Sequence, residues 1–170
     1  MARELVTPIR VRFRDLDALG HLNYAVYLTY LEEASNALWE EVLKRVGKRL
    51  VANDLGYVSA RAEIDYRNPA HCGETLNVSV WVTAIGASSF TTAYRITESG
   101  TGRLIASAKT VQVVTLPGPE KGKISDEVRA GLRVYWCTLL SPPSRRRGGA
   151  SASDAPFPLI FFPAALAGFS

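Results

Sequence analysis

Apolar and polar residues alternate along most of the chain between residues 58 and 115. This period of two is typical of half-buried β-strands. The alternation predicts strands over residues 58–67, 76–83, 90–96 and 104–115. Residues 98–103, with two glycines, have the composition of a tight hairpin turn. Ile9 to Phe13 alternate in the same way, so a five-stranded antiparallel sheet is predicted.

Two details of these strands decide which side chains face the core. In the strand over residues 58–67, one face is predicted to hold Val58, Ala60, Ala62, Ile64 and Tyr66. In the last strand the apolar positions change from Ala106 and Ala108 to Val111 and Val113. That change predicts a slip in register within the strand.

A long helix is predicted between the first and second strands, from about Tyr24 to about Val46. Its apolar residues recur at three- and four-residue steps and form one stripe: Tyr24, Tyr27, Leu28, Leu31, Ala34, Leu38, Val42 and Val46. Asn23 is a candidate N-cap, and Gly47 fits the helix stop. A short helix is predicted from Ser125 to about Val134.

The predicted elements give an α+β fold, because one long helix must cover the apolar face of the sheet. A single helix covers the edges of a five-stranded sheet poorly, so the sheet is expected to pair with a second copy. The fold is predicted to span residues 1–136. The tail over residues 137–170 is rich in Pro, Ser, Ala and Gly, and we expect it to be mostly disordered.

The charge balance excludes some partners and allows others. The formal net charge is +4 and the pI is about 9.2. That excess suits an anionic ligand and is too small to indicate nucleic-acid binding. Two cysteines give neither a zinc site nor a disulfide framework. The first residues lack a signal-peptide apolar run and no stretch is long enough to span a membrane, so a cytoplasmic protein is expected.

The stretch over residues 15–23 concentrates the candidate chemistry. It places Asp15, Asp17, His21 and Asn23 within nine residues, just before the predicted helix. A carboxylate there can act as general base or nucleophile, and a histidine can orient it or carry a proton. Asp and Asn also serve as turn and capping residues in such loops, so spacing alone leaves both interpretations open. The stretch has too few ligands for a metal site, and none is predicted.

The stretch from Phe13 to Leu28 resembles the signature of the 4-hydroxybenzoyl-CoA thioesterase-like family, roughly D-x-D-x-x-G-H-x-N-x-x-x-Y. Residues 62–69, 73–76 and 85–90 also resemble that family. The resemblance covers about residues 5–135. It implies a hotdog fold, in which a five-stranded antiparallel sheet wraps a long central helix, with active sites at the interface of a homodimer or homotetramer.

The resemblance implies hydrolysis of an acyl-CoA thioester, with coenzyme A as part of the substrate and no cofactor. Asp17 matches the catalytic aspartate, acting as nucleophile or as base on water, with His21 and Tyr24 beside it. A backbone N–H near Leu55 to Val58 is expected to polarise the thioester oxygen. The predicted substrate contacts are Asn23, Tyr27, Gly56, Tyr57, Val58, Arg67, Ser88 and Ser89.

Some features depart from the family pattern and keep alternatives open. Residues 86–89 lack the basic residues with which some relatives hold the nucleotide phosphates. An acyl-carrier-protein thioesterase is therefore one alternative. A non-catalytic acyl-CoA-binding module is a separate alternative. Glu32 and Glu33 on the helix and Glu63 on a strand are the alternative carboxylates.

Overall fold

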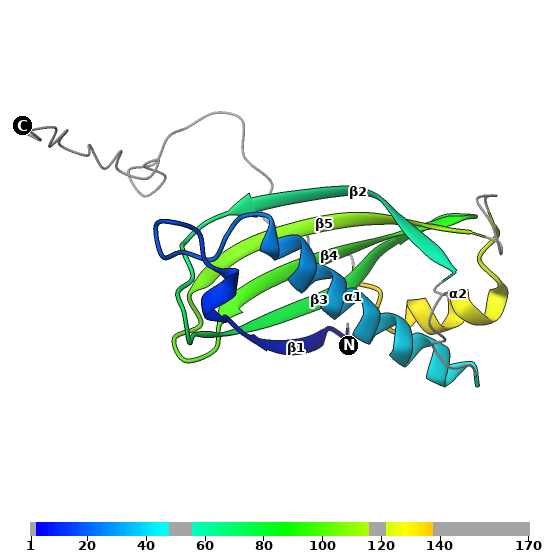
Figure 1. Cartoon of the computed structure of the whole chain (residues 1–170). Coiled ribbons are helices and arrows are strands. Elements are labelled where there is room, and N and C mark those ends of the chain that lie inside the picture. The colour runs from blue at the N-terminus through cyan, green and yellow to red at the C-terminus, as the bar shows by residue number, and fades with distance from the viewer. Residues whose placement is uncertain (1–2, 48–55, 116–121, 138–170) are drawn as a thin grey trace, which may run out of the picture.

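The computed structural model describes residues 3–47, 56–115 and 122–137. Within these ranges, five strands form one antiparallel sheet in the order β1-β3-β4-β5-β2. The strands are β1 (Leu5–Arg10), β2 (Tyr57–Tyr66), β3 (Thr75–Ile85), β4 (Ser89–Glu98) and β5 (Leu104–Val114). Helix α1 (Val26–Arg45) crosses one face of the sheet, and α2 (Asp126–Arg133) lies beside the end of α1 (Figure 1).

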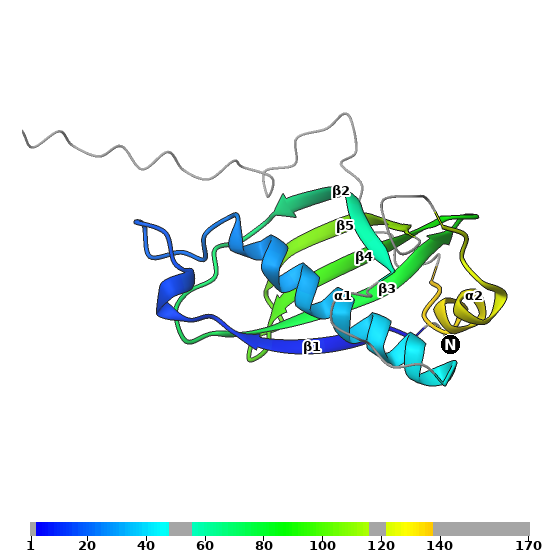
Figure 2. The ribbon, with the colours of Figure 1, turned by 45° about the vertical axis from the view of Figure 1, so that its right-hand side comes forward.

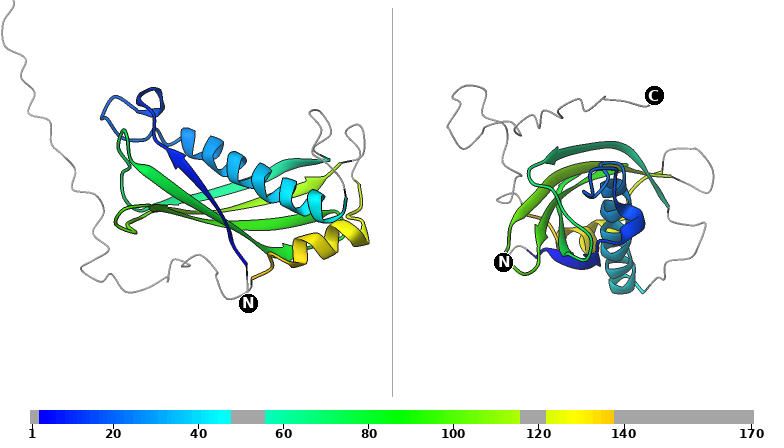
Figure 3. Two further views of the ribbon diagram at one scale, coloured as in Figure 1. Left: turned by 90° about the horizontal axis from the view of Figure 1, so that it is seen from below. Right: turned by 60° about the vertical axis from the view of Figure 1, so that its left-hand side comes forward.

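The sheet curves around α1, as the turned views show (Figures 2 and 3). The buried face of α1 carries Tyr30, Ala34 and Val42, and none of these side chains exposes any surface. They pack in one apolar core with β3 and β4 residues such as Val80 and Ile96. Burying each large apolar side chain contributes about 1.5–3 kcal/mol. The long helix wrapped by a five-stranded sheet is the arrangement that the sequence predicted.

The first strand begins and ends earlier than predicted. Leu5 to Arg10 pair with β3, and the strand predicted over residues 9–13 ends at Arg10. The backbone N–H of Arg12 donates to the side chain of Asp15, and a short 3₁₀ turn covers Phe13–Asp15. The carboxylate of Asp15 therefore turns the chain where the alternation alone would continue it.

The face assignment at the start of β2 was wrong. Ser59 pairs with Gln112 and Arg61 pairs with Val111, so Ala60 is an extra residue opposite their partners on β5. Such a β-bulge reverses the alternation of side chains. Val58 is consequently 53% exposed, and Tyr57 and Ser59 take the face that carries Ala62.

The register slip predicted within β5 was also wrong. The pairing of β5 with β4 is continuous from Ser89↔Val113 to Ile96↔Ala106, and it shifts only beyond Ile96. Thr110 and Gln112 therefore continue the inward row of Ala106 and Ala108. Both side chains are buried, with 5% and 2% of their surface exposed.

The helix ends follow local hydrogen bonds. Ser125 is the predicted cap of α2, and its Oγ accepts the N–H of Val128 at 3.3 Å. Asn23 is not the N-cap of α1, because Ala25 holds that position. The Oδ1 of Asn23 instead accepts the N–H of Ala25 at 2.9 Å.

The described chain ends at Cys137, which is buried and donates its N–H to Val82 at 2.9 Å. The rest of the tail predicted to be disordered, residues 138–170, lies outside the described residues. Among the helices of the described ranges, none has the length and apolar character to cross a membrane.

Candidate active site

The Asp17 turn, residues 16–22, is closed by backbone hydrogen bonds. The N–H of Asp17 donates to the carbonyl of His21 at 2.8 Å, and the N–H of Gly20 donates to the carbonyl of Asp17 at 3.1 Å. Gly20 has a φ of 77°, a conformation that glycine adopts without steric cost. Leu16 and Leu22 pair at the base of the turn. The turn therefore holds the backbone of Asp17 in one position.

The carboxylate of Asp17 is held by one oxygen only. Its Oδ1 accepts the N–H of Leu19 at 2.8 Å and the N–H of His21 at 3.1 Å. Its Oδ2 has no hydrogen bond to any of the described residues. The side chain is half-buried. Backbone donors therefore fix the direction of the carboxylate and leave one oxygen for a ligand or a water molecule.

Asp15 has a different environment, although it lies only two residues away. It is 4% exposed, and its carboxylate accepts hydrogen bonds from Arg12 at 2.8 Å and from the hydroxyl of Tyr30 at 2.8 Å. The Arg12 guanidinium, with help from Tyr30, holds the pKa of Asp15 below its ordinary value against the opposing effect of burial. Asp15 thus anchors the turn to α1 and has no free oxygen for chemistry.

The structure places a second histidine, His71, beside His21. The rings of His21 and His71 meet edge to face with centroids 5.4 Å apart, and the two residues form a backbone bridge. His71 is fixed by Glu74, whose Oε2 accepts its N–H at 3.0 Å. The link from His21 to Asp17 runs through the backbone. Sequence reasoning missed His71, because residues 69–73 carried only the signal of a strand break.

Three tyrosines surround the entrance to α1. Tyr27 is buried and meets the ring of Tyr66 edge to face, with centroids 5.0 Å apart. The hydroxyl of Tyr66 donates to the carbonyl of Tyr24 at 3.0 Å, while Tyr24 itself is 73% exposed. Burial raises the pKa of Tyr27 to about 12, so its hydroxyl stays protonated at neutral pH. The structure brings Asp17, His21, Asn23, Tyr24 and Tyr27 to one end of the molecule.

A second group of predicted residues lies at the other end of the sheet. The carbonyl of Gly56 accepts the N–H of Thr115, and the carbonyl of Ser88 accepts the N–H of Val114. Ser89 begins β4, and Tyr57 begins β2. The ten residues of β2 separate this group from Tyr66 by about 30 Å. One copy of the chain therefore does not bring the two groups together. Leu55, the first residue of the predicted oxygen-binding stretch, lies outside the described residues.

Arg67 follows β2 at the same end as the Asp17 turn. Its backbone N–H donates to Ile105 at 2.8 Å, and its Nε is buried without a hydrogen-bond partner in the described residues. The side chain is half-buried. It supplies positive charge beside the end of β2, and its contact with substrate stays a prediction.

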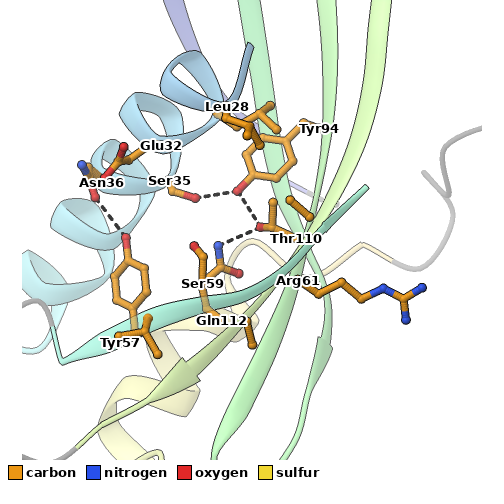
Figure 4. A pocket seen from close by; sticks show the side chains of 14 residues that line it. Leu28, Glu32, Ser35, Asn36, Tyr57, Ser59, Arg61, Tyr94, Thr110 and Gln112 are labelled. Atoms are coloured by element: carbon orange, nitrogen blue, oxygen red, sulfur yellow. Dashed lines mark hydrogen bonds between the residues drawn. The ribbon is translucent and has the colours of Figure 1, made fainter. Parts of the chain in front are cut away.

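A cavity of about 550 Å³ lies between α1 and β2. Tyr57 and Val58 line it, as does Glu32, which the sequence marked as an alternative carboxylate. Its inner wall is polar and comes from Ser35, Tyr94, Thr110 and Gln112 (Figure 4). Sequence reasoning missed this wall, because the polar positions of β5 were assigned to the outer face.

Comparisons with known proteins identify the family of the chain. Residues 11–132 match the profile of the thioesterase-like superfamily. A 1,4-dihydroxy-2-naphthoyl-CoA hydrolase from Synechococcus elongatus is 32% identical over 61% of this chain and 75% of its own length. The long-chain acyl-CoA thioesterase FadM from Escherichia coli is 27% identical over 72% of this chain and 98% of its own length.

A solved structure extends the likeness to three dimensions. A thioesterase from Thermus thermophilus, crystallised with coenzyme A and zinc, superposes with a TM-score of 0.67 at 29% identity. The match covers 76% of this chain and 92% of that one. The fold and the matched residues define a hotdog-fold thioester hydrolase. The chain belongs to the thioesterase-like superfamily, which confirms the family resemblance found around the Asp17 turn.

Proposed function

We propose that this protein hydrolyses acyl-CoA thioesters and that Asp17 provides the reacting carboxylate. The observation that carries the proposal is the arrangement of that side chain, with Oδ1 held by two backbone N–H groups and Oδ2 free of described partners. A carboxylate so oriented is prepared for attack without reorganisation. Asp15 is excluded from this role, because its carboxylate is already engaged by Arg12 and Tyr30.

The reaction needs no group beyond the substrate and water. The Oδ2 of Asp17 either attacks the thioester carbon or takes a proton from the water that attacks it. The carbonyl oxygen then carries negative charge, which backbone N–H donors stabilise. Collapse of the tetrahedral species breaks the carbon–sulfur bond and releases the thiolate of coenzyme A. In the nucleophilic route the acyl group is left as an anhydride with Asp17, and one water molecule hydrolyses it to the free acid and restores the carboxylate. In the general-base route the acid forms directly, and the proton taken up by Asp17 passes to the departing thiolate. Coenzyme A enters only as part of the substrate.

The active site is proposed to form between two copies of the chain. β2 is an edge strand of ten residues whose side chains are mostly exposed, and such an edge pairs readily with another strand. Antiparallel pairing of β2 with its copy would place the start of one β2 beside the end of the other. The Gly56–Val58 segment of one subunit would then lie near the Asp17 turn of its partner. This supports a homodimer, or a homotetramer built from such dimers.

The proposed location is the cytoplasm. Cys72 and Cys137 are both free in the structure, which suits a reducing compartment. We propose that the enzyme meets its acyl-CoA substrates in that compartment.

The proposal is tested by turnover of a panel of acyl-CoA thioesters by the wild type and by Asp17→Asn. The change removes the charge and keeps the shape, so we expect kcat/KM to fall by about 10²- to 10⁴-fold. Asp126→Asn is the matched control, since Asp126 is an exposed aspartate in the first turn of α2, and its kcat/KM should stay near that of the wild type. Analytical ultracentrifugation of all three proteins reports whether the dimer is present and intact.

Each outcome has a distinct meaning. Hydrolysis that is lost in Asp17→Asn, with the dimer retained, supports both the reaction and the residue. Full activity in that variant would reject Asp17 and move attention to Glu32. A wild type that hydrolyses no acyl-CoA would reject the proposed substrate, and a monomeric but active wild type would reject the shared site.

A further inference from the structure

The wall of the cavity between α1 and β2 holds a buried network of side-chain hydrogen bonds. The hydroxyls of Thr92, Tyr94 and Thr110 lie within 2.8–3.0 Å of one another, and Ser35 reaches Tyr94 at 2.5 Å. The amide of Gln112 donates to Thr110 at 2.7 Å. All five side chains are at most 9% exposed. Figure 4 shows Tyr94, Thr110 and Gln112 facing the space between α1 and β2.

The network does not use all of its hydrogen-bonding capacity. Thr92 has one hydroxyl hydrogen, yet Tyr94 at 2.9 Å and the Oε1 of Gln112 at 3.4 Å both lie within its reach. The amide nitrogen of Gln112 carries two hydrogens, and among the described residues it donates to Thr110 alone. A second amide hydrogen and the weakly bonded carbonyl of Gln112 are therefore available to a ligand that enters the cavity.

A purely apolar ligand would be a poor occupant of this wall. It would cover the amide of Gln112 and the hydroxyl of Tyr94 without offering hydrogen bonds, and buried polar groups without partners are costly. A ligand carrying a hydroxyl or keto group would instead bond to them. The hydroxyl hydrogens of Thr92, Tyr94 and Thr110 can also be redistributed among their contacts, so the wall can meet either a donor or an acceptor.

The cavity lies where the acyl group of the proposed reaction would extend. It begins at Leu28, in the first turn of α1 at the end that carries the Asp17 turn, and it continues to Asn36, a length of about 12 Å. Its outer wall is β2, the strand proposed to join two subunits. Its volume of about 550 Å³ falls in the range of small-molecule sites.

We propose that the acyl group of the substrate carries a hydroxyl or keto substituent on the part remote from the thioester, and that Gln112, Thr110 and Tyr94 recognise it. This inference rests on the proposed thioesterase function and specifies its substrate class. Unsubstituted alkyl and aryl acyl groups are the poorer substrates, since they leave the polar wall without partners.

The test compares pairs of acyl-CoA thioesters that differ by one polar group. Benzoyl-CoA is set against its 3- and 4-hydroxy derivatives, and octanoyl-CoA against hydroxyoctanoyl-CoA with the hydroxyl toward the chain end. In the wild type we expect kcat/KM to be at least about tenfold higher for the better hydroxylated member of a pair. Gln112→Leu has nearly the same shape and should bring that ratio close to one. The ratio is the readout, so a general loss of activity in the variant cancels.

Two further variants separate recognition from folding. Thr110→Val should also reduce the ratio, and it provides the test of the wall if Gln112→Leu does not fold. Ser107→Ala is the control. Ser107 is a buried residue of β5 that lies between Ala106 and Ala108, so its hydroxyl is on the opposite face of the sheet from the wall. The ratio for this variant should equal that of the wild type. A wild type that hydrolyses the unsubstituted members as fast as the hydroxylated ones overturns the inference. A preference for the hydroxylated members that survives in both Gln112→Leu and Thr110→Val also overturns the inference.

The inference and the proposed function fail in different ways. Equal hydrolysis of hydroxylated and unsubstituted thioesters rejects recognition of a polar acyl group but leaves the proposed thioesterase function in place. If no thioester is hydrolysed, ligand-observed NMR with 4-hydroxybenzoate and benzoate still reports on the cavity. Stronger binding of the hydroxylated acid, lost in Gln112→Leu, would support the polar wall without the reaction. Equal binding would reject it.

Discussion

The Asp17 turn and the cavity wall both keep polar groups inside the protein, and they do so in different ways. In the turn, the partners of Asp17 are backbone N–H groups two and four residues ahead. In the wall, Ser35 and Tyr94 are 59 residues apart in the chain, and Thr92 and Thr110 are 18 apart. The turn is thus determined by its own sequence, whereas the wall forms only when β4 and β5 pair and α1 packs against them.

The largest expected effect on stability comes from the anchor of the turn. Asp15→Asn removes the charge that Arg12 and Tyr30 bond, and it places an amide N–H against two donors. We expect the free energy of unfolding to fall by about 2–3 kcal/mol. Urea denaturation at pH 7 measures this difference.

The same variant has a defined pH dependence. The folded pKa of Asp15 lies below its unfolded value, so its stabilisation is complete above about pH 4 and is lost as the pH falls through the lower folded value. The difference between wild type and Asp15→Asn should therefore shrink below about pH 4. A difference that is constant from pH 7 to pH 3 would show that the carboxylate charge is not what holds the turn.

A smaller effect is expected from the glycine that closes the turn. Gly20→Ala meets no neighbouring atom within 4 Å, but it forces alanine to a φ of 77°, which costs about 1–2 kcal/mol. Relief of that strain should move Asp17 and lower kcat by about tenfold. Gly102→Ala is the matched control, with a φ of 72° and equally free space in the β4–β5 turn. It should lose the same stability with kcat unchanged. Equal kcat values for the two variants would show that the geometry of the Asp17 turn does not affect the reaction.

The smallest expected effect tests the wall. Thr92→Val keeps the side-chain shape and removes the hydroxyl that contacts Tyr94 and Thr110. These two retain each other as partners at 3.0 Å, so we expect a loss of only about 1 kcal/mol in thermal or urea unfolding. A loss above about 3 kcal/mol would indicate that the network serves mainly to hold the sheet together.

Most of the fold could be predicted from sequence, because its elements follow local periodicity. The strand alternation, the stripe on α1 and the Ser125 cap all depend on residues close together in the chain. The candidate turn was found because Asp15, Asp17, His21 and Asn23 lie within nine residues, and the family resemblance assigned Asp17 its role where spacing left two interpretations open. His71 and Gln112 could not be found in this way, because His71 meets His21, which lies 50 residues earlier in the chain, and Gln112 lies beside Thr92 of the neighbouring strand β4. The sequence assigned Thr110 and Gln112 to the outer face after a change of register, whereas they continue the inner row of Ala106 and Ala108 and form the wall of a cavity.

The bulge at Ala60 has a consequence for how this cavity could change over evolutionary time. With the extra residue present, Tyr57 points inward and donates its hydroxyl to Asn36 at 3.0 Å. Deleting the codon for Ala60 would remove the unpaired residue and leave Ser59 opposite Gln112 and Arg61 opposite Val111, so Tyr57 and Ser59 would still point inward. The binding surface would keep its polar residues with every other residue of the chain unchanged. In this fold, the edge strand can gain or lose one residue at the bulge without altering the side chains that meet a ligand.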